Sequence, residues 1–262
     1  LTDPESDPRY YEYWRGYHEI MQRHGVSPDL ARTVIRTNNT VIASMMLHRG
    51  EVDAMICGTH GQYSWHLKHV LDVIGKAKGV CDVSALSGLI VNKGTYFICD
   101  TQVTFDPSVE EIVEMTLLGA EAIRRFGAEP KVALISHSNF GNADTSSAMK
   151  MRQAVGMLRD QAPELEVEGE MHPDAALDPN YRSFIFPNSC LQGPANFLVF
   201  PSLDAANGAF NLLKSAGDGL GVGPLLLGAA KPVHILTSSV SARGLVNMSA
   251  LAAVDAQSRK KQ

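Results

Sequence analysis

Residues 131–161, KVALISHSNFGNADTSSAMKMRQAVGMLRDQ, decide the fold class. After Lys131 the first residues form a short apolar run without charge, which is typical of a buried strand. A polar loop that contains glycine follows, and residues 147–161 have the composition of a helix. The same order of strand, loop and helix recurs along the chain. The sequence therefore predicts an α/β fold with a mostly parallel sheet.

The other elements are predicted outward from this stretch. Strands are expected at 53–58, 165–172, 195–202 and 232–237, and a strand or apolar turn at 222–228. Helices are expected at 9–24, 29–47, 64–75, 106–127 and 205–217, with a last one beginning near Ser241. The segment between residues 172 and 195, which contains Pro179, Pro187 and Gly193, is expected to be a loop.

Two local signals are specific. Residues 83–104, VSALSGLIVNKGTYFICDTQVT, contain two strand-like runs around Asn92-Lys93-Gly94, which predicts an antiparallel hairpin and hence a mixed sheet. Ser108 and Glu111 have the spacing of a capping box at the start of the 106–127 helix.

Composition excludes several classes of protein. The formal charge is −5, with 45% hydrophobic and 19% charged residues, an ordinary globular balance without the basic stripe of a nucleic-acid-binding surface. The apolar stretches are too short and too glycine-broken to span a membrane, and the polar N-terminal residues do not resemble a signal peptide. The four widely spaced cysteines predict reduced thiols in a cytoplasmic protein, not a disulfide framework or a zinc site.

Three motifs invite a chemical interpretation. The loop at 136–147 precedes a helix, where backbone N–H groups can bind an anion, but it is not a Walker loop, and an ordinary loop capped by Asp144 or Thr145 is the alternative. Gly223-Pro224 belongs to a glycine-rich segment without a dinucleotide fingerprint. His66 and His69 have a metal-binding spacing but no matching acid or cysteine, so we expect partly exposed surface histidines and no metal.

Several stretches together resemble the phosphate acetyl/butyryltransferase family. They are EVDAMICGTHG, EPKVALISHSNFG, SSAMKMRQAV, VEGEMHPDAAL, ANFLVFPSLDAAN, GVGPLLLGAAKPVHILT and LVNMSALAAVDAQ, in that order over almost the whole chain. One branch of the family is most similar to this chain in four sequence stretches: SHSNFG, KMRQA, GEMHPDAAL and AKPVHILT. That branch is the C-terminal phosphotransacetylase-like domain of the large hybrid NADP-dependent malic enzymes of bacteria.

The resemblance implies a two-lobed fold with mixed, mostly parallel sheets and an interlobe cleft, similar to isocitrate and isopropylmalate dehydrogenases. Lobe I would comprise residues 1–76 plus 233–262, and lobe II residues 77–232. The family has further strand–helix units ahead of DPRYYEYW. We therefore expect lobe I to be discontinuous and incomplete, in a fragment of a longer polypeptide.

In active members of the family, the strand after KPV leads into Ser-Arg-Gly, with an Asp seven positions after the Ser. The Ser and Asp handle the thiol proton of CoA, and the Arg acts on the phosphate. Here Thr237 matches the Ser, Ser238 replaces the Arg and Gly244 falls at the Asp. A further catalytic Arg of the family appears as Lys68, which keeps the charge but loses the bidentate fork. The resemblance therefore predicts no catalytic residue in this domain.

What the resemblance implies is a catalytically degenerate regulatory domain of an NADP-dependent malic enzyme. It would bind acetyl-CoA or CoA as an allosteric effector and contribute to oligomerisation, with a dimer through this domain. The oxidative decarboxylation of malate, NADP and a divalent metal would belong to the N-terminal malic enzyme domain alone. The expected ligand-binding residues are Ser136, Ser138, Asn139, Gly141, Asn207, Gly223, Pro224, Lys231, Thr237, Ser238, Arg243 and Lys68.

Two alternatives stay open. One is an active phosphate acetyltransferase, which converts acetyl-CoA and phosphate to acetyl phosphate and CoA through residues not identified in the sequence. The other is a purely structural dimerisation module, for which the apolar stripe of the last helix would serve as an interface; plain core is the alternative and the commoner role of such a stripe. That stripe consists of Leu245, Met248, Leu251 and Val254.

Overall fold

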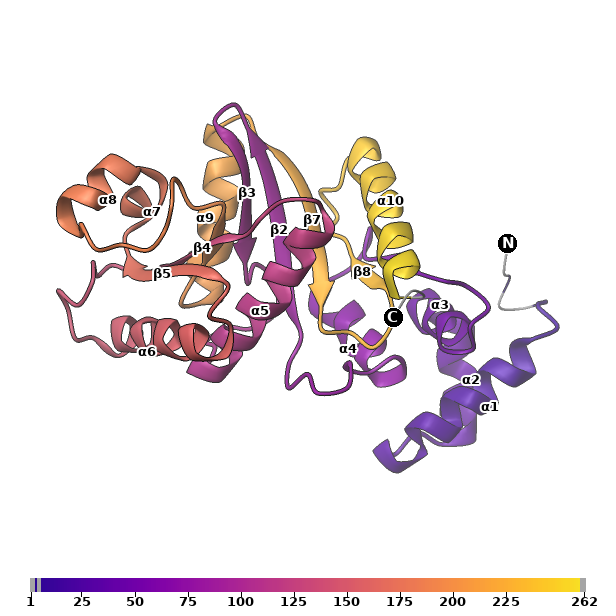
Figure 1. Cartoon of the computed structure of the whole chain (residues 1–262). Helices are drawn as coiled ribbons and strands as arrows, with labels where there is room; N and C mark the ends of the chain where they lie inside the picture. Colours follow the sequence, from indigo (N-terminus) through magenta and orange to yellow (C-terminus); the bar gives the residue numbers. More distant parts are fainter. Residues whose placement is uncertain (1–2, 4–5, 260–262) are drawn as a thin grey trace. The chain divides into compact units, whose positions relative to one another are not determined.

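The computed structural model describes Asp3 and residues 6–259 (Figure 1). The chain divides into two compact units, each with a sheet of its own. Unit 1 comprises Leu1–Gly79 and Ala229–Gln262, and unit 2 comprises Val80–Gly228. The strands are mostly parallel and alternate with helices, so the predicted α/β fold is confirmed. Within the described residues, no helix is both long and apolar enough to cross a membrane.

Unit 1 contains a two-stranded parallel sheet of β1 and β8, in which Met55 pairs with Val233 and Cys57 with Ile235. Its elements are α1 (Tyr10–Met21), a 3-10 turn (Gln22–His24), α2 (Pro28–Thr37), α3 (Asn39–His48), β1 (Met55–Cys57), α4 (Tyr63–Val73), β8 (Val233–Ile235) and α10 (Ala242–Arg259). Tyr13, Tyr17 and Met21, spaced four apart on α1, bury one helix face against Ile35 and Met45.

Unit 2 contains a six-stranded sheet of order β5-β4-β6-β3-β2-β7. Its elements are β2 (Ser84–Val91), β3 (Gly94–Cys99), α5 (Val109–Arg125), β4 (Lys131–Ile135), α6 (Ser146–Gln161), β5 (Glu166–Met171), α7 (Pro173–Leu177), α8 (Pro179–Ile185), β6 (Phe197–Val199), α9 (Leu203–Ala216) and β7 (Leu220–Leu227). The predicted hairpin is confirmed as β2 and β3, and β2 is antiparallel to both of its neighbours.

Alternating side chains place the core of unit 2 on both faces of its sheet. Leu198 packs with Ala206 of α9, whereas the neighbouring Phe197 contacts Gly119 of α5. This period of two is the geometry of a strand buried on both faces. Both faces of the central strands are therefore covered by helices, as Figure 1 shows for α5 and α9.

The start of α5 follows its sequence signal. Ser108 accepts the N–H of Glu111, and the Glu111 carboxylate accepts the N–H of Ser108, so the predicted capping box is present. Thr145, one of the two predicted caps, begins α6 by accepting the N–H of Ala148.

The single helix expected at 29–47 is wrong. Asn38 has an extended backbone and separates α2 from α3, and its side chain accepts the N–H of Val41 to cap α3. An asparagine at this position competes with helix continuation by offering its own acceptor to the following turn.

The loop expected between residues 172 and 195 is also wrong, since it contains α7 and α8. Pro173 and Pro179 occupy the first helical positions, where proline is favoured because its missing N–H has no partner to lose. The fully buried Arg182 fixes the segment, because its guanidinium donates to the carbonyls of Ala175, Ala176, Leu191 and Gly193.

A close contact on α5 predicts an asymmetry between two glycines. A Cβ at Gly119 would lie 2.4 Å from the Phe197 ring, whereas a Cβ at Gly156 of α6 would meet nothing within 4 Å. We expect Gly119→Ala to lower the free energy of unfolding by about 1–3 kcal/mol through overpacking. Gly156→Ala should raise it by up to about 1 kcal/mol, because alanine favours the helix. Urea unfolding of both variants tests this, and equal effects would contradict the packing.

Candidate functional site

The loop after β4 is built around one buried carboxylate. Glu170, 1% exposed at the end of β5, accepts the Ser138 hydroxyl at 2.7 Å and the Gly141 N–H at 2.9 Å. Arg152 of α6 donates to both carboxylate oxygens, at 3.0 and 3.1 Å. The same guanidinium donates to the carbonyl of Ala143 at 2.8 Å. Glu170 and Arg152 therefore hold the loop from both sides.

These contacts decide the charge of Glu170. Burial alone would raise the pKa of its carboxyl, but the hydrogen bonds from Arg152, Ser138 and Gly141 outweigh burial and lower the pKa below its usual 4.5. The carboxylate in turn raises the pKa of the Arg152 guanidinium. The pair is thus ionised at neutral pH, and its charges are directed at each other.

The predicted ligand-binding residues of this loop differ in their role: three have side chains that bond within the protein, and the fourth, Gly141, is exposed. Ser136 and Ser138 are buried; the Ser136 hydroxyl accepts the N–H of Ser138, and the Ser138 hydroxyl bonds to Asn142 of the loop and to Glu170. The Asn139 amide oxygen accepts the N–H of His172 at 2.8 Å, which ties the loop to the residue after β5. Gly141 is exposed at a φ of 91°, a backbone conformation that favours glycine. Gly141 therefore stands at the surface, and the other three shape the loop.

A second group joins residues far apart in the sequence. The Asn207 amide donates to the carbonyl of Thr101 at 3.0 Å, and the Thr101 and Ser87 hydroxyls are 2.7 Å apart. Gly223-Pro224 lies in β7 opposite the irregularity of β2 at Leu86 to Gly88, and a Cβ on Gly223 would be 3.0 Å from the Leu86 carbonyl. Asn207 and the Gly223-Pro224 pair thus flank β2 from two elements.

Sequence reasoning missed the carboxylate that shapes the neighbouring loop after β3. Asp100 is 3% exposed, and its two oxygens accept the N–H groups of Ala85, Gln102, Val103 and Thr104. The parallel strands β3, β4, β5 and β6 end at one edge of the sheet, so this loop and the 136–144 loop belong to the same edge. Ligands of open α/β sheets bind at such edges.

In unit 1 the loop after β8 is held by hydroxyl groups. The Thr237 and Ser239 hydroxyls are 3.0 Å apart, and Ser241 accepts the N–H of Gly244 in the first turn of α10. The backbone of Leu236 lies so close to Gly58 that a Cβ there would be 2.3 Å from the Leu236 carbonyl. The loops after β1 and β8 are therefore neighbours at the carboxyl ends of their strands.

The three predicted cations of unit 1 differ in their surroundings. Arg243 is exposed in the first turn of α10, and no carboxylate among the described residues pairs with it. Lys68 is 67% exposed and pairs with Asp72 at 2.7 Å. Lys231 donates to the carbonyls of Leu47 and His48 at the end of α3, ahead of β8 and away from the Thr237 loop. Lys231 therefore has a structural partner, and only Arg243 offers an unpaired charge.

The expectation of surface histidines at the start of α4 is wrong for His66. It is 6% exposed, with Nδ1 2.8 Å from the Thr40 hydroxyl and Nε2 2.6 Å from the carbonyl of His60. This histidine ties the loop after β1 to α3. Within residues 3 and 6–259, no group of three or more potential ligands has the arrangement of a metal site.

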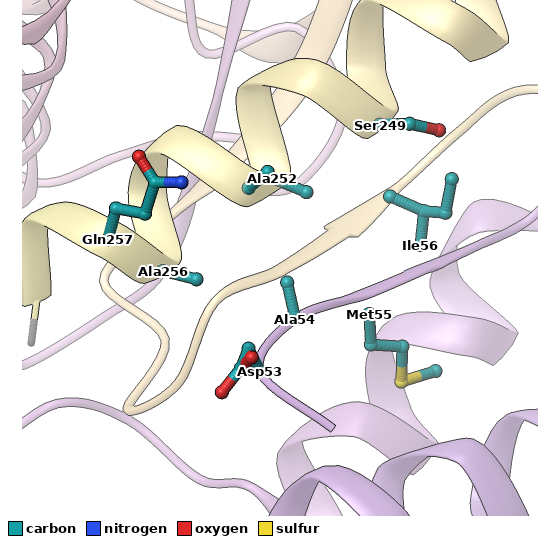
Figure 2. A pocket seen from close by; sticks show the side chains of 9 residues that line it. Asp53, Ala54, Met55, Ile56, Ser249, Ala252, Ala256 and Gln257 are labelled. Atoms are coloured by element: carbon teal, nitrogen blue, oxygen red, sulfur yellow. The ribbon is translucent and has the colours of Figure 1, made fainter.

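A cavity of about 320 Å³ lies between β1 and α10 within unit 1 (Figure 2). Asp53, Ala54, Met55 and Ile56 line it from the β1 side, and small residues of α10, with Ser249 and Gln257, line it from the other. None of the predicted ligand-binding residues is among its lining residues. The cavity is therefore separate from the candidate loops.

The Glu170–Arg152 pair generates a test by mutation and pH. Glu170→Gln removes the charge that Arg152, the Ser138 hydroxyl and the Gly141 N–H bind, so we expect it to lower the free energy of unfolding by about 1–3 kcal/mol at pH 7. Because the pKa of Glu170 is lowered on folding, its stabilisation is complete above pH 4.5 and is lost as the pH falls below that value.

Unfolding curves at several pH values measure this difference. The gap between wild type and Glu170→Gln should shrink below pH 4.5, whereas Glu164→Gln, an exposed control, should match wild type throughout. A gap that persists unchanged at low pH would contradict an ionised Glu170.

Comparison with known proteins agrees with this geometry. The family model described as "Phosphate acetyl/butaryl transferase" matches residues 1–253. The chain is 52% identical over 97% of its length to an NAD-dependent malic enzyme of Rhizobium meliloti, and 50% identical over 99% to an NADP-dependent malic enzyme of Escherichia coli. It spans only 33% and 34% of these two relatives, about a third of their length.

A solved structure supports the same assignment. The EutD phosphotransacetylase from Staphylococcus aureus is 27% identical, with a TM-score of 0.85 over 98% of this chain and 78% of that one. The chain thus matches a phosphotransacetylase in fold and corresponds to the phosphotransacetylase-like part of the malic enzymes. The resemblance inferred from the motifs is confirmed, and the chain belongs to the phosphate acetyl/butaryl transferase family.

Proposed function

We propose that this chain is a catalytically degenerate phosphotransacetylase-like domain that binds acetyl-CoA and regulates a malic enzyme on the same polypeptide. The observation that carries the proposal is the chemistry of the loop after β8. The positions that match the family's Ser, Arg and Asp hold Thr237, Ser238 and Gly244. An acid and a guanidinium are thus replaced by a glycine and a hydroxyl.

The consequence for acetyl transfer follows from the reaction. Attack by a thiol requires a base to take its proton, and acetyl phosphate requires positive charge near its developing oxygens. The Thr237 and Ser239 hydroxyls bond to each other, and no ionised group of the described part of the chain is paired with them. A Cβ at Gly244 would lie 2.9 Å from a Val240 methyl, so the local packing also opposes an acid there. These features support binding without turnover.

The remaining groups suit a nucleotide thioester. Arg243 is an exposed cation in the first turn of α10, where the macrodipole and the free N–H groups also favour an anion. In unit 2, Gly141 presents backbone, and Ser136, Ser138 and Asn139 shape its loop. In unit 1 we assign ligand contacts to Arg243 and Ser238, and in unit 2, taken by itself, the candidate contacts are Gly141, Asn207, Gly223 and Pro224. Lys231 and Lys68 are left out because each has a protein partner.

The regulatory role is proposed from the relatives. The two malic enzymes are about three times as long as this chain, so this segment would be one part of a larger enzyme. NADP or NAD and a divalent metal would bind in the other part, and malate would be decarboxylated there. Acetyl-CoA would act as effector if it binds two states of the assembly with different affinity. The two-lobed, dimeric arrangement inferred from the family belongs to the same proposal.

Calorimetric titration tests binding and catalysis together. Acetyl-CoA should bind the chain with a dissociation constant in the micromolar range, on the order of −8 kcal/mol. Acetyl phosphate alone should bind far more weakly, and incubation of acetyl-CoA with phosphate should release no CoA thiol. Rapid CoA release would contradict degeneracy, and the absence of binding would contradict the effector role.

Arg243 gives the sharpest single test of the site. Arg243→Ala should weaken acetyl-CoA binding by about 1–3 kcal/mol, because a charge-assisted bond to a CoA phosphate is lost. Lys93→Ala, an exposed cation in the β2–β3 turn, is the matched control and should leave the affinity unchanged. Equal affinities for wild type and Arg243→Ala would remove Arg243 from the site.

A further inference from the structure

The first two helices carry a surface in which arginines cover aromatic rings. It consists of Tyr10, Tyr11, Trp14 and Arg15 of α1 with Arg32 and Arg36 of α2. We call it the arginine–aromatic surface. None of these residues belongs to the loops of the candidate site.

The rings and cations form ordered layers. Trp14 and Tyr10 pack inward against the buried core of unit 1. The Arg32 guanidinium carbon lies 4.3 Å from the Trp14 ring centroid, and that of Arg36 lies 4.9 Å from the Tyr10 ring. The Tyr10 hydroxyl donates to the Arg32 carbonyl at 3.0 Å and ties the two helices together. The guanidinium groups are therefore held in place before any partner arrives.

The N–H donors of these arginines are left for a partner. A guanidinium stacked on a ring keeps its N–H edge free for a carboxylate. Arg36 and Arg15 pair with no carboxylate among the described residues, and Arg32 pairs only with Asp29, whose side chain is 92% exposed.

Two other arginines of unit 1, in contrast, form ion pairs with carboxylates of the same unit. Arg9 binds Asp7 and Glu51, and Arg49 binds Glu12 and Glu51. Those carboxylates tie α1 to the segment after α3. Among the described residues, the exposed Asp29 is the one carboxylate paired with an arginine of the arginine–aromatic surface. The composition of this surface, Arg, Trp and Tyr, is the one enriched at the energetic centres of protein interfaces.

Two observations indicate which partner fits. Unit 1 carries 14 Lys and Arg against 10 Asp and Glu, whereas unit 2 carries 9 against 18, so unit 1 is the basic part of an acidic chain. Both ends of the chain belong to unit 1, so any further part of the polypeptide is joined to this unit. The two malic enzyme relatives contain about twice as much additional chain as this segment.

From these observations we infer that the arginine–aromatic surface docks against a carboxylate-bearing face of the malic enzyme part of the same polypeptide. The inference rests on the proposed function for the identity of that part. It adds a route of communication: an effector bound to this domain would be sensed through the contact at α1 and α2.

Hydrogen exchange and kinetics of the full-length polypeptide test the docking. The amides of α1 and α2 should exchange at least tenfold more slowly in the full polypeptide than in this chain alone. The double variant Arg32→Glu/Arg36→Glu should remove that difference. The ratio of malic enzyme activities with and without saturating acetyl-CoA should also fall to 1, while basal activity stays unchanged.

The control is Arg23→Glu, which makes the same type of substitution, with half the total charge change, at one exposed arginine of the neighbouring 3-10 turn. It should behave like wild type in both measurements, and thermal unfolding should show both variants folded. Slow exchange and an intact acetyl-CoA response in the double variant would overturn the docking. Equal effects of Arg23→Glu would do the same, because net charge would then be the cause.

Failure of the proposed function gives a different result. If acetyl-CoA does not alter wild-type activity, the effector role fails, and the exchange measurement alone still decides whether the surface is docked. If wild type responds but α1 and α2 exchange equally fast in the chain and in the full polypeptide, the docking is wrong and the effector role stands.

Discussion

The buried carboxylate of Glu170 is the interaction on which the candidate site of unit 2 depends. A parallel strand ends in backbone groups that the sheet no longer satisfies, and the long loop after β4 must find partners for its own N–H groups. Glu170 supplies them from the adjacent strand, and Arg152 balances the charge from the following helix. The Asp100 carboxylate likewise accepts backbone N–H groups at the loop after β3. Two buried carboxylates thus hold the loops at the carboxyl ends of these parallel strands.

The charged groups at the candidate loops differ between the two units. In unit 2 the ionised Glu170 and Arg152, which hold the 136–144 loop, are directed at each other. In unit 1 the loop after β8 holds hydroxyls, a glycine and one exposed arginine. Burial also raises the pKa of the Cys57 thiol at the end of β1 to about 12, which disfavours the thiolate at neutral pH. The exposed Arg243 and the replacement of the family's acid by Gly244 are the reasons for which we propose binding without turnover.

Local signals in the sequence predicted much of the fold. The hairpin at Asn92-Lys93-Gly94, the Ser108 capping box and the Thr145 cap depend on residues close together in the chain, and all are confirmed. The wrong predictions concern structure that local patterns do not determine. Asn38 ends one helix and begins another, which requires a choice between two caps. Arg182 orders α7 and α8 by donating to carbonyls up to 11 residues away. His66 is buried by Thr40, 26 residues earlier. For the same reason, no spacing rule links Glu170 to Ser138.

The central claim, that this domain binds acetyl-CoA without using it, is most directly tested by one NMR experiment on the acetyl methyl resonance. Saturation transfer from protein to that methyl reports binding, and the same tube with phosphate reports acetyl phosphate as it forms. Our account predicts saturation transfer that free CoA competes away, with no acetyl phosphate signal over hours. Absence of transfer, or a growing acetyl phosphate signal, would contradict it.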